Sequence, residues 1–97
     1  MIQAGGDVNE QTGSGLTPLH EASREGHVEV VNRLIQAGGD VNSQDELGWA
    51  PLHHASMYGH VEVITALLAA GADKTLKDNG GRTPHWWATN QDIRNAL

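Results

Sequence analysis

The sequence TPLH at residues 17–20 returns as APLH at residues 50–53 and as TPHW at residues 83–86, so one short pattern recurs at a fixed interval. A longer stretch, IQAGGDVN, occurs at residues 2–9 and again, letter for letter, at residues 35–42. A fixed period of this size is typical of a protein built from stacked units, each burying its apolar faces only against its neighbours. The chain is therefore expected to be a repeat protein.

Each repeat contains two short helical patterns. The first begins at the proline of the repeated motif, preceded by a threonine N-cap at Thr17 and Thr83, and ends at Gly26 or Gly59. The second follows at once and is more apolar, with apolar residues on more than one face. Ala50 replaces the capping threonine in the middle repeat, which should cost this repeat roughly 1 kcal/mol. Both helices are too short to persist alone, so their stability must come from stacking.

The complete pattern reads glycine-x-Thr-Pro-Leu-His, then alanine, then Gly-His-x-Glu-Val-Val, then Ala-Gly-x-Asp-Val-Asn. It closely resembles the ankyrin repeat, and the resemblance covers essentially the whole chain. It implies L-shaped units of two antiparallel helices and a β-hairpin, stacked into a slightly curved solenoid. The expected fold class is an all-α-dominated repeat solenoid of stacked helix-turn-helix pairs with β-hairpin or turn loops. About two full repeats would be present, with partial repeats at both ends.

The repeat register divides a single domain, residues 1–97, into four parts. Residues 1–6 would be the end of a preceding repeat, residues 7–39 and 40–72 complete repeats, and residues 73–97 a degenerate terminal repeat. In that last part a histidine and a tryptophan stand where the earlier repeats have Leu-His. We expect a fragment of a longer array, whose uncapped ends allow self-association.

Composition excludes several classes of function. The net charge of -6 argues against nucleic acid as a partner, because capture of phosphates needs clustered lysine and arginine. No apolar run is long enough for a membrane span. The chain has no cysteine, so it has no disulfide or thiolate metal site, which fits a cytoplasmic or nuclear protein.

No catalytic motif is recognisable. Six histidines invite a metal hypothesis, but His20 and His53 are repeat positions. The resemblance implies that each bonds its own capping threonine and the neighbouring loop. Asp45 and Glu46 lie in a turn that we expect to be exposed, where paired carboxylates have no special chemistry. We therefore expect no enzyme activity, no metal and no cofactor.

The resemblance places partner binding on the loop tips and on the exposed side of the first helix. Large apolar or aromatic residues occur there at positions that the scaffold does not require to be apolar. His54 is expected to be exposed on this surface. The candidate partner-binding residues are Leu16, Arg24, Gln44, Glu46, Leu47, Trp49, His54, Met57, Tyr58, Arg82 and Trp87.

The expected function is a protein-interaction module without catalysis. The alternative is a substrate-recruiting, regulatory or inhibitory module of a larger enzyme or ubiquitin-ligase-type assembly. A purely structural spacer is a further alternative, in which Leu47 and Trp49 only pack, half exposed, against neighbouring loops. The resemblance also marks Asn42 as a position that an asparagine hydroxylase could modify, although a plain turn asparagine explains it as well.

Overall fold

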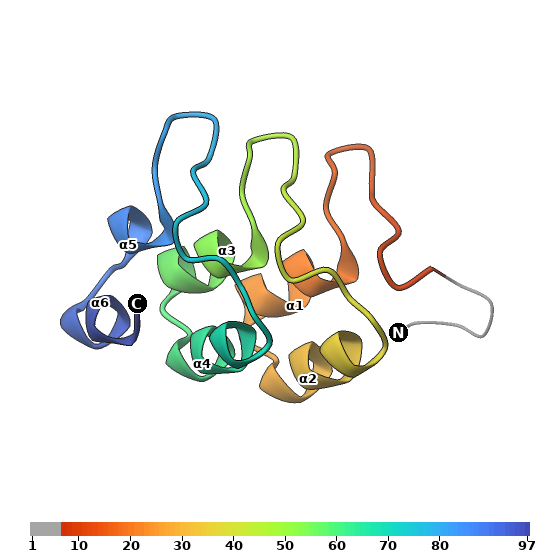
Figure 1. The fold of residues 1–97 in the computed structure, drawn as a ribbon, viewed down its shortest axis with the longest axis horizontal. Coiled ribbons are helices and arrows are strands. Elements are labelled where there is room, and N and C mark those ends of the chain that lie inside the picture. Colours follow the sequence, from red (N-terminus) through yellow and green to blue (C-terminus); the bar gives the residue numbers. More distant parts are fainter. Residues whose placement is uncertain (1–6) are drawn as a thin grey trace.

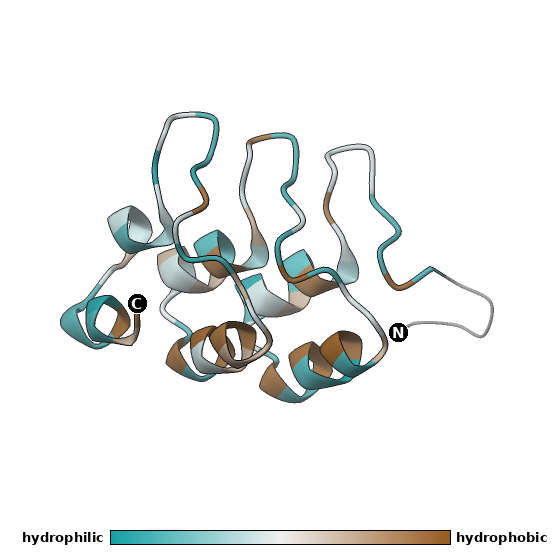
Figure 2. Ribbon diagram, in the orientation of Figure 1, coloured by the Kyte–Doolittle hydropathy of each residue, from teal (hydrophilic) through white to brown (hydrophobic). Residues whose placement is uncertain are grey.

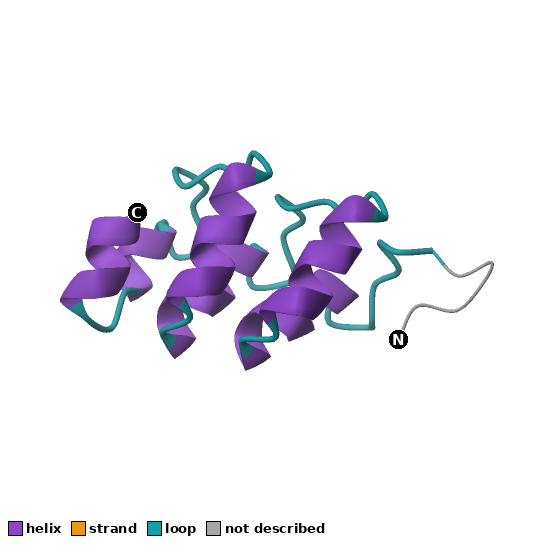
Figure 3. Cartoon of the chain, turned by 90° about the horizontal axis from the view of Figure 1, so that it is seen from below, coloured by secondary structure: helices purple, strands orange, loops and turns teal. Residues whose placement is uncertain are grey.

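The computed structural model describes residues 7–97, in which six short helices form two parallel rows (Figure 1). The first six residues, which the repeat register assigns to a preceding repeat, lie outside the described part. One row consists of the first helix of each unit and the other row of the second, and the loops project on the side of the first row (Figures 1 and 3). The first-row helices are α1 (Pro18–Glu25), α3 (Pro51–Tyr58) and α5 (Pro84–Trp87). The second-row helices are α2 (Val28–Gln36), α4 (Val61–Ala69) and α6 (Gln91–Ala96).

The predicted start and stop signals of the first helix are confirmed in the first repeat. The Thr17 hydroxyl accepts a hydrogen bond from the His20 backbone N–H at 3.3 Å, and the His20 Nδ1 accepts one from the Thr17 backbone N–H at 3.0 Å. Both groups would otherwise be unpaired at the helix start. Gly26 ends the helix at φ 78°, a left-handed conformation that favours glycine.

The middle repeat has the same backbone geometry but makes only one of the two cap hydrogen bonds. Ala50 has the same extended backbone as Thr17 but makes no side-chain cap hydrogen bond, as predicted from its missing hydroxyl. The His53 Nδ1 still accepts from the Ala50 backbone N–H at 3.0 Å. The imidazole therefore maintains the helix start without the threonine.

The third repeat departs from the pattern. Its helix α5 has only four residues, and Thr83, expected as an N-cap, makes no side-chain cap bond. The chain turns extended at Ala88, with φ -59° and ψ 128°, where the earlier repeats continue helical. The Gly-His pair of the other repeats is absent here, so no left-handed glycine separates the two helices.

The core is a slab between the two rows. Helix α3 packs between α1 and α5, and α4 packs between α2 and α6. The most deeply buried large side chains come from helices of both rows, and Figure 2 shows the apolar colour concentrated in the second row. Full burial of one such side chain contributes about 1.5–3 kcal/mol. The largest fully buried apolar residues are Leu19, Leu52, Ile64, Leu67, Ile93, Val31 and Val63.

The connections between repeats are loops rather than β-hairpins, so the expected hairpin strands are not seen between residues 7 and 97. Each loop closes with two backbone bonds, such as Asp45 N–H to Trp49 C=O at 3.0 Å and Gly48 N–H to Asp45 C=O at 2.9 Å. Two bonds around one turn are too few for a strand ladder. Other polar groups of the loops bond to an acceptor side chain of the same loop or to the neighbouring loop.

None of the described helices is long and apolar enough to cross a membrane. The longest contain nine residues, as in α2 and α4.

Ala50→Thr should stabilise the folded chain by about 1 kcal/mol, because it supplies the hydroxyl that Thr17 uses at the same backbone geometry. Thr17→Ala is the matched control and should lose a similar amount. Urea unfolding, followed by circular dichroism, measures both. A loss of stability in Ala50→Thr would show that the buried site has no room for the added atoms.

Candidate partner-binding site

Buried histidines join each repeat to the loop of the next. The His20 Nε2 donates to the Trp49 backbone carbonyl at 2.8 Å, and the His53 Nε2 donates to the Arg82 carbonyl at 3.0 Å. Because each Nδ1 accepts a backbone N–H, the single ring proton must sit on Nε2. Burial lowers the pKa of both imidazoles, although these hydrogen bonds and nearby aspartates oppose it. The bond to the neighbouring loop that the resemblance implied is confirmed for both histidines. The bond to a capping threonine is present only for His20, whose Nδ1 lies 2.8 Å from the Thr17 Oγ1, because His53 has Ala50 at that position.

The loop tips also bond directly to one another. The Glu46 backbone N–H donates to the Ser14 carbonyl at 2.9 Å, and the Asn79 N–H donates to the Leu47 carbonyl at 3.0 Å. Gln44 adds a side-chain bond from Nε2 to the Lys77 carbonyl at 3.0 Å. The loops are therefore fixed in position relative to one another through main-chain groups.

Each loop closes around one acceptor side chain at the same repeat position. In the first loop it is Thr12, whose Oγ1 accepts from the Leu16 backbone N–H at 3.2 Å. In the second it is Asp45, whose Oδ1 accepts from the Leu47 and Trp49 N–H groups at 3.0 and 2.9 Å. In the third loop the acceptor is Asp78, whose Oδ1 accepts from the Gly80 and Arg82 N–H groups.

Asp78 has the most donors of the three. Its Oδ1 accepts from the Gly80 and Arg82 backbone N–H groups, both at 2.9 Å. Its Oδ2 accepts from the indole N–H of Trp49 at 3.0 Å and of Trp87 at 2.9 Å. Burial acts to raise the pKa of this carboxyl, but the four donors outweigh it and hold the pKa below its ordinary value.

A row of rings runs along the loop side of the first helices. The His54 ring meets the His20 ring edge to face at a centroid distance of 5.5 Å and the Trp49 ring at 5.2 Å. Trp49 meets Trp87 at 5.2 Å, and Trp87 meets Trp86 at 4.9 Å. The row continues to the third repeat, where the Arg82 guanidinium lies 4.4 Å from the centroid of the Trp86 ring.

A small pocket of about 230 Å³ opens between the first and second loops. Its walls are mainly apolar, with three charged side chains, Arg24, Asp45 and Glu46, among the lining residues. Arg24 is half-buried, and the described residues give its guanidinium no ion-pair partner. The lining residues are Ser14, Leu16, Arg24, Asp45, Glu46, Leu47, Trp49 and His54.

Six of the candidate residues from the sequence line this pocket: Leu16, Arg24, Glu46, Leu47, Trp49 and His54. The other five lie elsewhere. Tyr58 is 52% exposed at the end of α3, with half-buried Met57 beside it. The remaining three are engaged in packing: Gln44 by its bond to the next loop, Arg82 by its stacking on Trp86, and Trp87 by its bond to Asp78.

Two expectations about exposure are wrong. His54 is only 4% exposed, because its Nε2 lies 3.1 Å from the Asp45 Oδ2 and its ring packs between His20 and Trp49. The turn itself is exposed at Glu46, as expected, but the Asp45 side chain is buried because it bonds with its own loop and with His54. Burial lowers the pKa of His54, although the bond to Asp45 opposes the shift.

Trp49 is half-buried, and its indole N–H donates to Asp78 in the next loop. The alternative in which Trp49 packs against a neighbouring loop is therefore correct for this side chain. Leu47, in contrast, is 52% exposed at a loop tip. Of the apolar residues that line the pocket, Leu47 is therefore exposed, while Leu16 and Trp49 are half-buried.

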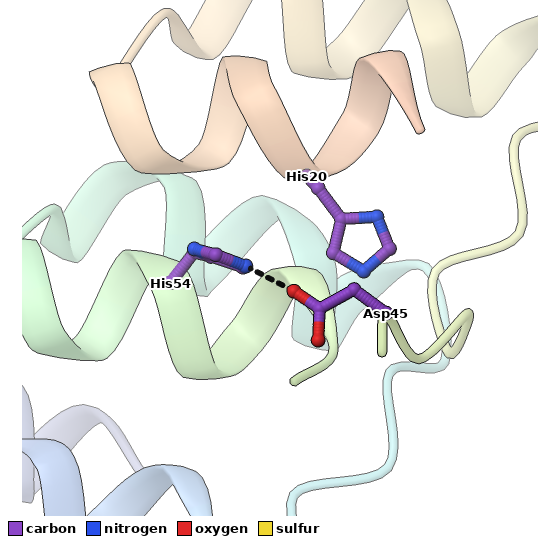
Figure 4. Close-up of side chains that lie close together, drawn as sticks. All are labelled: His20, Asp45 and His54. Carbon is purple, nitrogen blue, oxygen red and sulfur yellow. Dashed lines mark hydrogen bonds and ion pairs between the residues drawn. The ribbon is translucent and has the colours of Figure 1, made fainter. Parts of the chain in front are cut away.

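His20, Asp45 and His54 lie close enough to suggest a metal site, with their ligand atoms within 4.8 Å of one another (Figure 4). His20 does not fit that role. To bind a metal through Nε2 its proton would have to move to Nδ1, which faces the Thr17 backbone N–H, so two donors would oppose each other. The cluster is better explained as a bonded element between two repeats.

Asn42, the candidate for hydroxylation, has a scaffold function in the structure. Its Oδ1 accepts from the Asp73 backbone N–H at 2.7 Å, and Asn9 repeats the arrangement with the Asp40 N–H at 2.7 Å. Each asparagine thus joins its own turn to the next repeat. Modification of Asn42 stays a prediction.

The stacked helix pairs, with loops projecting from one side, define a repeat solenoid. A family model described as ankyrin repeats, in three copies, matches residues 1–78. The chain belongs to the ankyrin-repeat family, whose members generally bind other proteins and are typically not catalysts. A comparison with curated proteins finds no match.

Sequence reasoning missed Asp45 and Asp78 as the centres of their loops. A signal was present, because each aspartate is followed nine residues later by a side chain with an N–H donor, His54 or Trp87. The first repeat lacks both members, with Thr12 and Glu21 at the two positions. The pattern therefore appears in only two of three repeats and is easily overlooked.

Asp78→Asn should destabilise the folded chain at neutral pH by about 2 kcal/mol, because an amide cannot accept from all four donors. Folding lowers the pKa of Asp78 from its ordinary value of 3.8. At a pH above that value the ionised carboxylate stabilises the folded chain, and this stabilisation is lost as the pH falls through the folded-state pKa. Urea unfolding at neutral and acid pH measures both effects. The exposed Asp92→Asn is the control, and equal stability of the two variants at neutral pH would contradict the assignment.

Proposed function

We propose that this chain is a protein-interaction module without intrinsic catalysis, which binds a partner on its loop tips and on the exposed side of its first helices. The observation that supports it most is the pocket between the first two loops, with exposed Leu47 on its wall. Exposed apolar side chains that gather in one place indicate an interaction site, and Leu47 lies beside Leu16 and Trp49 in this pocket. The membership of the ankyrin-repeat family supports the same function.

Fixed loops favour binding. The main-chain bonds Glu46 N–H to Ser14 C=O and Asn79 N–H to Leu47 C=O hold the tips before any partner arrives. A surface that is already ordered loses little conformational entropy on binding, so more of the contact energy appears as affinity. Recruitment of a substrate to a larger enzyme or ligase would use the same surface and is a special case of this function.

Leu47→Ser combined with Tyr58→Ser should weaken partner binding at least about tenfold, because both side chains are 52% exposed and apolar contact is lost without loss of a core residue. The measurement is the affinity for a partner captured from cell lysate, by fluorescence anisotropy or calorimetry. Val61→Ser on α4, in the other row of helices, is the control. Unchanged affinity in the double variant, with the fold intact by circular dichroism, would contradict the proposed surface.

Self-association is a second candidate, supported by the ends of the stack. Val30 is 45% exposed, while Val63, at the same position one repeat later, is 1% exposed. Trp86 is 60% exposed, while His20 and His53, at its repeat position, are buried. Each end therefore exposes a position that is covered between repeats, and the two ends of different copies could cover each other.

Sedimentation velocity over a range of concentrations tests this second candidate. We expect the average mass to rise with concentration and Val30→Glu to reduce the rise. A chain that stays monomeric at all concentrations would exclude association through the ends and leave the binding surface on the loops unaffected.

A further inference from the structure

We propose that the pocket between the first and second loops binds an extended segment of a partner protein that carries a large apolar residue and, two residues away, an aspartate or glutamate. This inference rests on the proposed function and adds the chemistry of the partner.

The pocket exists because one repeat position changes along the chain. Leu16, Trp49 and Arg82 occupy the same position in successive repeats. Between the second and third loops, Trp49 packs edge to face on Trp87 at 5.2 Å, so side chains occupy that space. Between the first and second loops the corresponding pair is Leu16 and His54, and the pocket lies beside them. A leucine in place of a tryptophan leaves space for a side chain from outside.

The size and lining of the pocket suit one apolar side chain. Its volume of about 230 Å³ is below the roughly 300–1,000 Å³ of pockets that hold whole small molecules. Leu16, Leu47 and Trp49 provide apolar contact on its walls. An inserted leucine, methionine or phenylalanine would bury most of its surface there, as anchor residues do in protein interfaces.

The charges beside the pocket favour an acidic neighbour. Arg24 is half-buried, and the described residues provide no ion pair to it, so a partner carboxylate can pair with it without displacing an internal partner. The Asp45 carboxylate is already engaged by two backbone N–H groups and by His54. Glu46 is exposed, where water and salt screen its charge. A carboxylate of the partner placed against Arg24 gains a direct ion pair, whereas Asp45, held by its three donors, and exposed Glu46 repel it only through space.

The main chain of the loop tips is not available to a partner at this place. The Ser14 carbonyl, the Glu46 N–H and the Leu47 carbonyl are already bonded between loops. A partner strand cannot add to them, so recognition depends on side chains. In an extended segment, residues two positions apart point to the same side, which allows one to enter the pocket while the other reaches Arg24.

An NMR titration of the labelled chain tests the inference, with the short peptide GSLSDSG as the probe. We expect saturable shifts of the Leu16 and Leu47 amide signals and of the Trp49 indole N–H signal. GSLSNSG should bind about tenfold more weakly, because its amide cannot form the charged bond to Arg24. GSLSKSG should bind more weakly still, because its lysine is repelled.

Two variants of the chain complete the test. Leu16→Trp places in the first repeat the residue that Trp49 provides in the second, and it should fill the pocket and abolish peptide binding while the urea midpoint is kept. Arg24→Gln should make GSLSDSG and GSLSNSG bind equally. If Leu16→Trp binds GSLSDSG as tightly as the unaltered chain does, the inference is overturned.

Three peptide results would also overturn it: no saturable shift with GSLSDSG, equal binding of the asparagine peptide to the unaltered chain, or tighter binding of the lysine peptide. The proposed function is judged separately by the variant with Leu47→Ser and Tyr58→Ser. If that variant loses its protein partner while Leu16→Trp and Arg24→Gln keep it, the binding surface stands and only the pocket assignment fails.

Discussion

The hydrogen bond from the buried first-helix histidine of one repeat to the loop carbonyl of the next is the interaction on which the rest of the structure depends. A helix of eight residues such as α1 does not persist alone, so each repeat needs its neighbour. Through one neutral imidazole, His20 maintains its own helix start with Nδ1 and reaches the Trp49 carbonyl with Nε2. Local structure and stacking are therefore stabilised by the same side chain, and His53 repeats this one unit later.

From this bond the positions of the second and third loops follow. Once the base of each of these loops is fixed, its tip closes around Asp45 or Asp78, and the tips bond to the preceding loop. The side chains at these fixed positions then determine the shape of the surface. Where the chain has Trp49 and Trp87 the space is occupied, and where it has Leu16 a pocket opens.

The repeated elements were predictable from the sequence, because they depend on local chemistry that recurs. Thr17 with the proline after it, and the left-handed Gly26 and Gly59, mark helix ends that the structure confirms. The buried state of His54 was not predictable in this way, since it depends on Asp45 nine residues earlier, a pair that the first repeat lacks. The short α5 goes with a departure from the repeat pattern, since the third repeat lacks the Gly-His pair, but its length could not be predicted from the pattern of the other two repeats.

The central claim is that hydrogen bonds between repeats hold the loop tips in place before a partner binds. Amide hydrogen exchange of the free chain tests it most directly, at the Glu46 and Asn79 N–H groups that bridge successive loops. Although these residues are exposed, the account predicts exchange nearly as slow as that of buried Ala55 in α3. Exchange as fast as in an unstructured peptide would show that the tips move independently and would contradict the account.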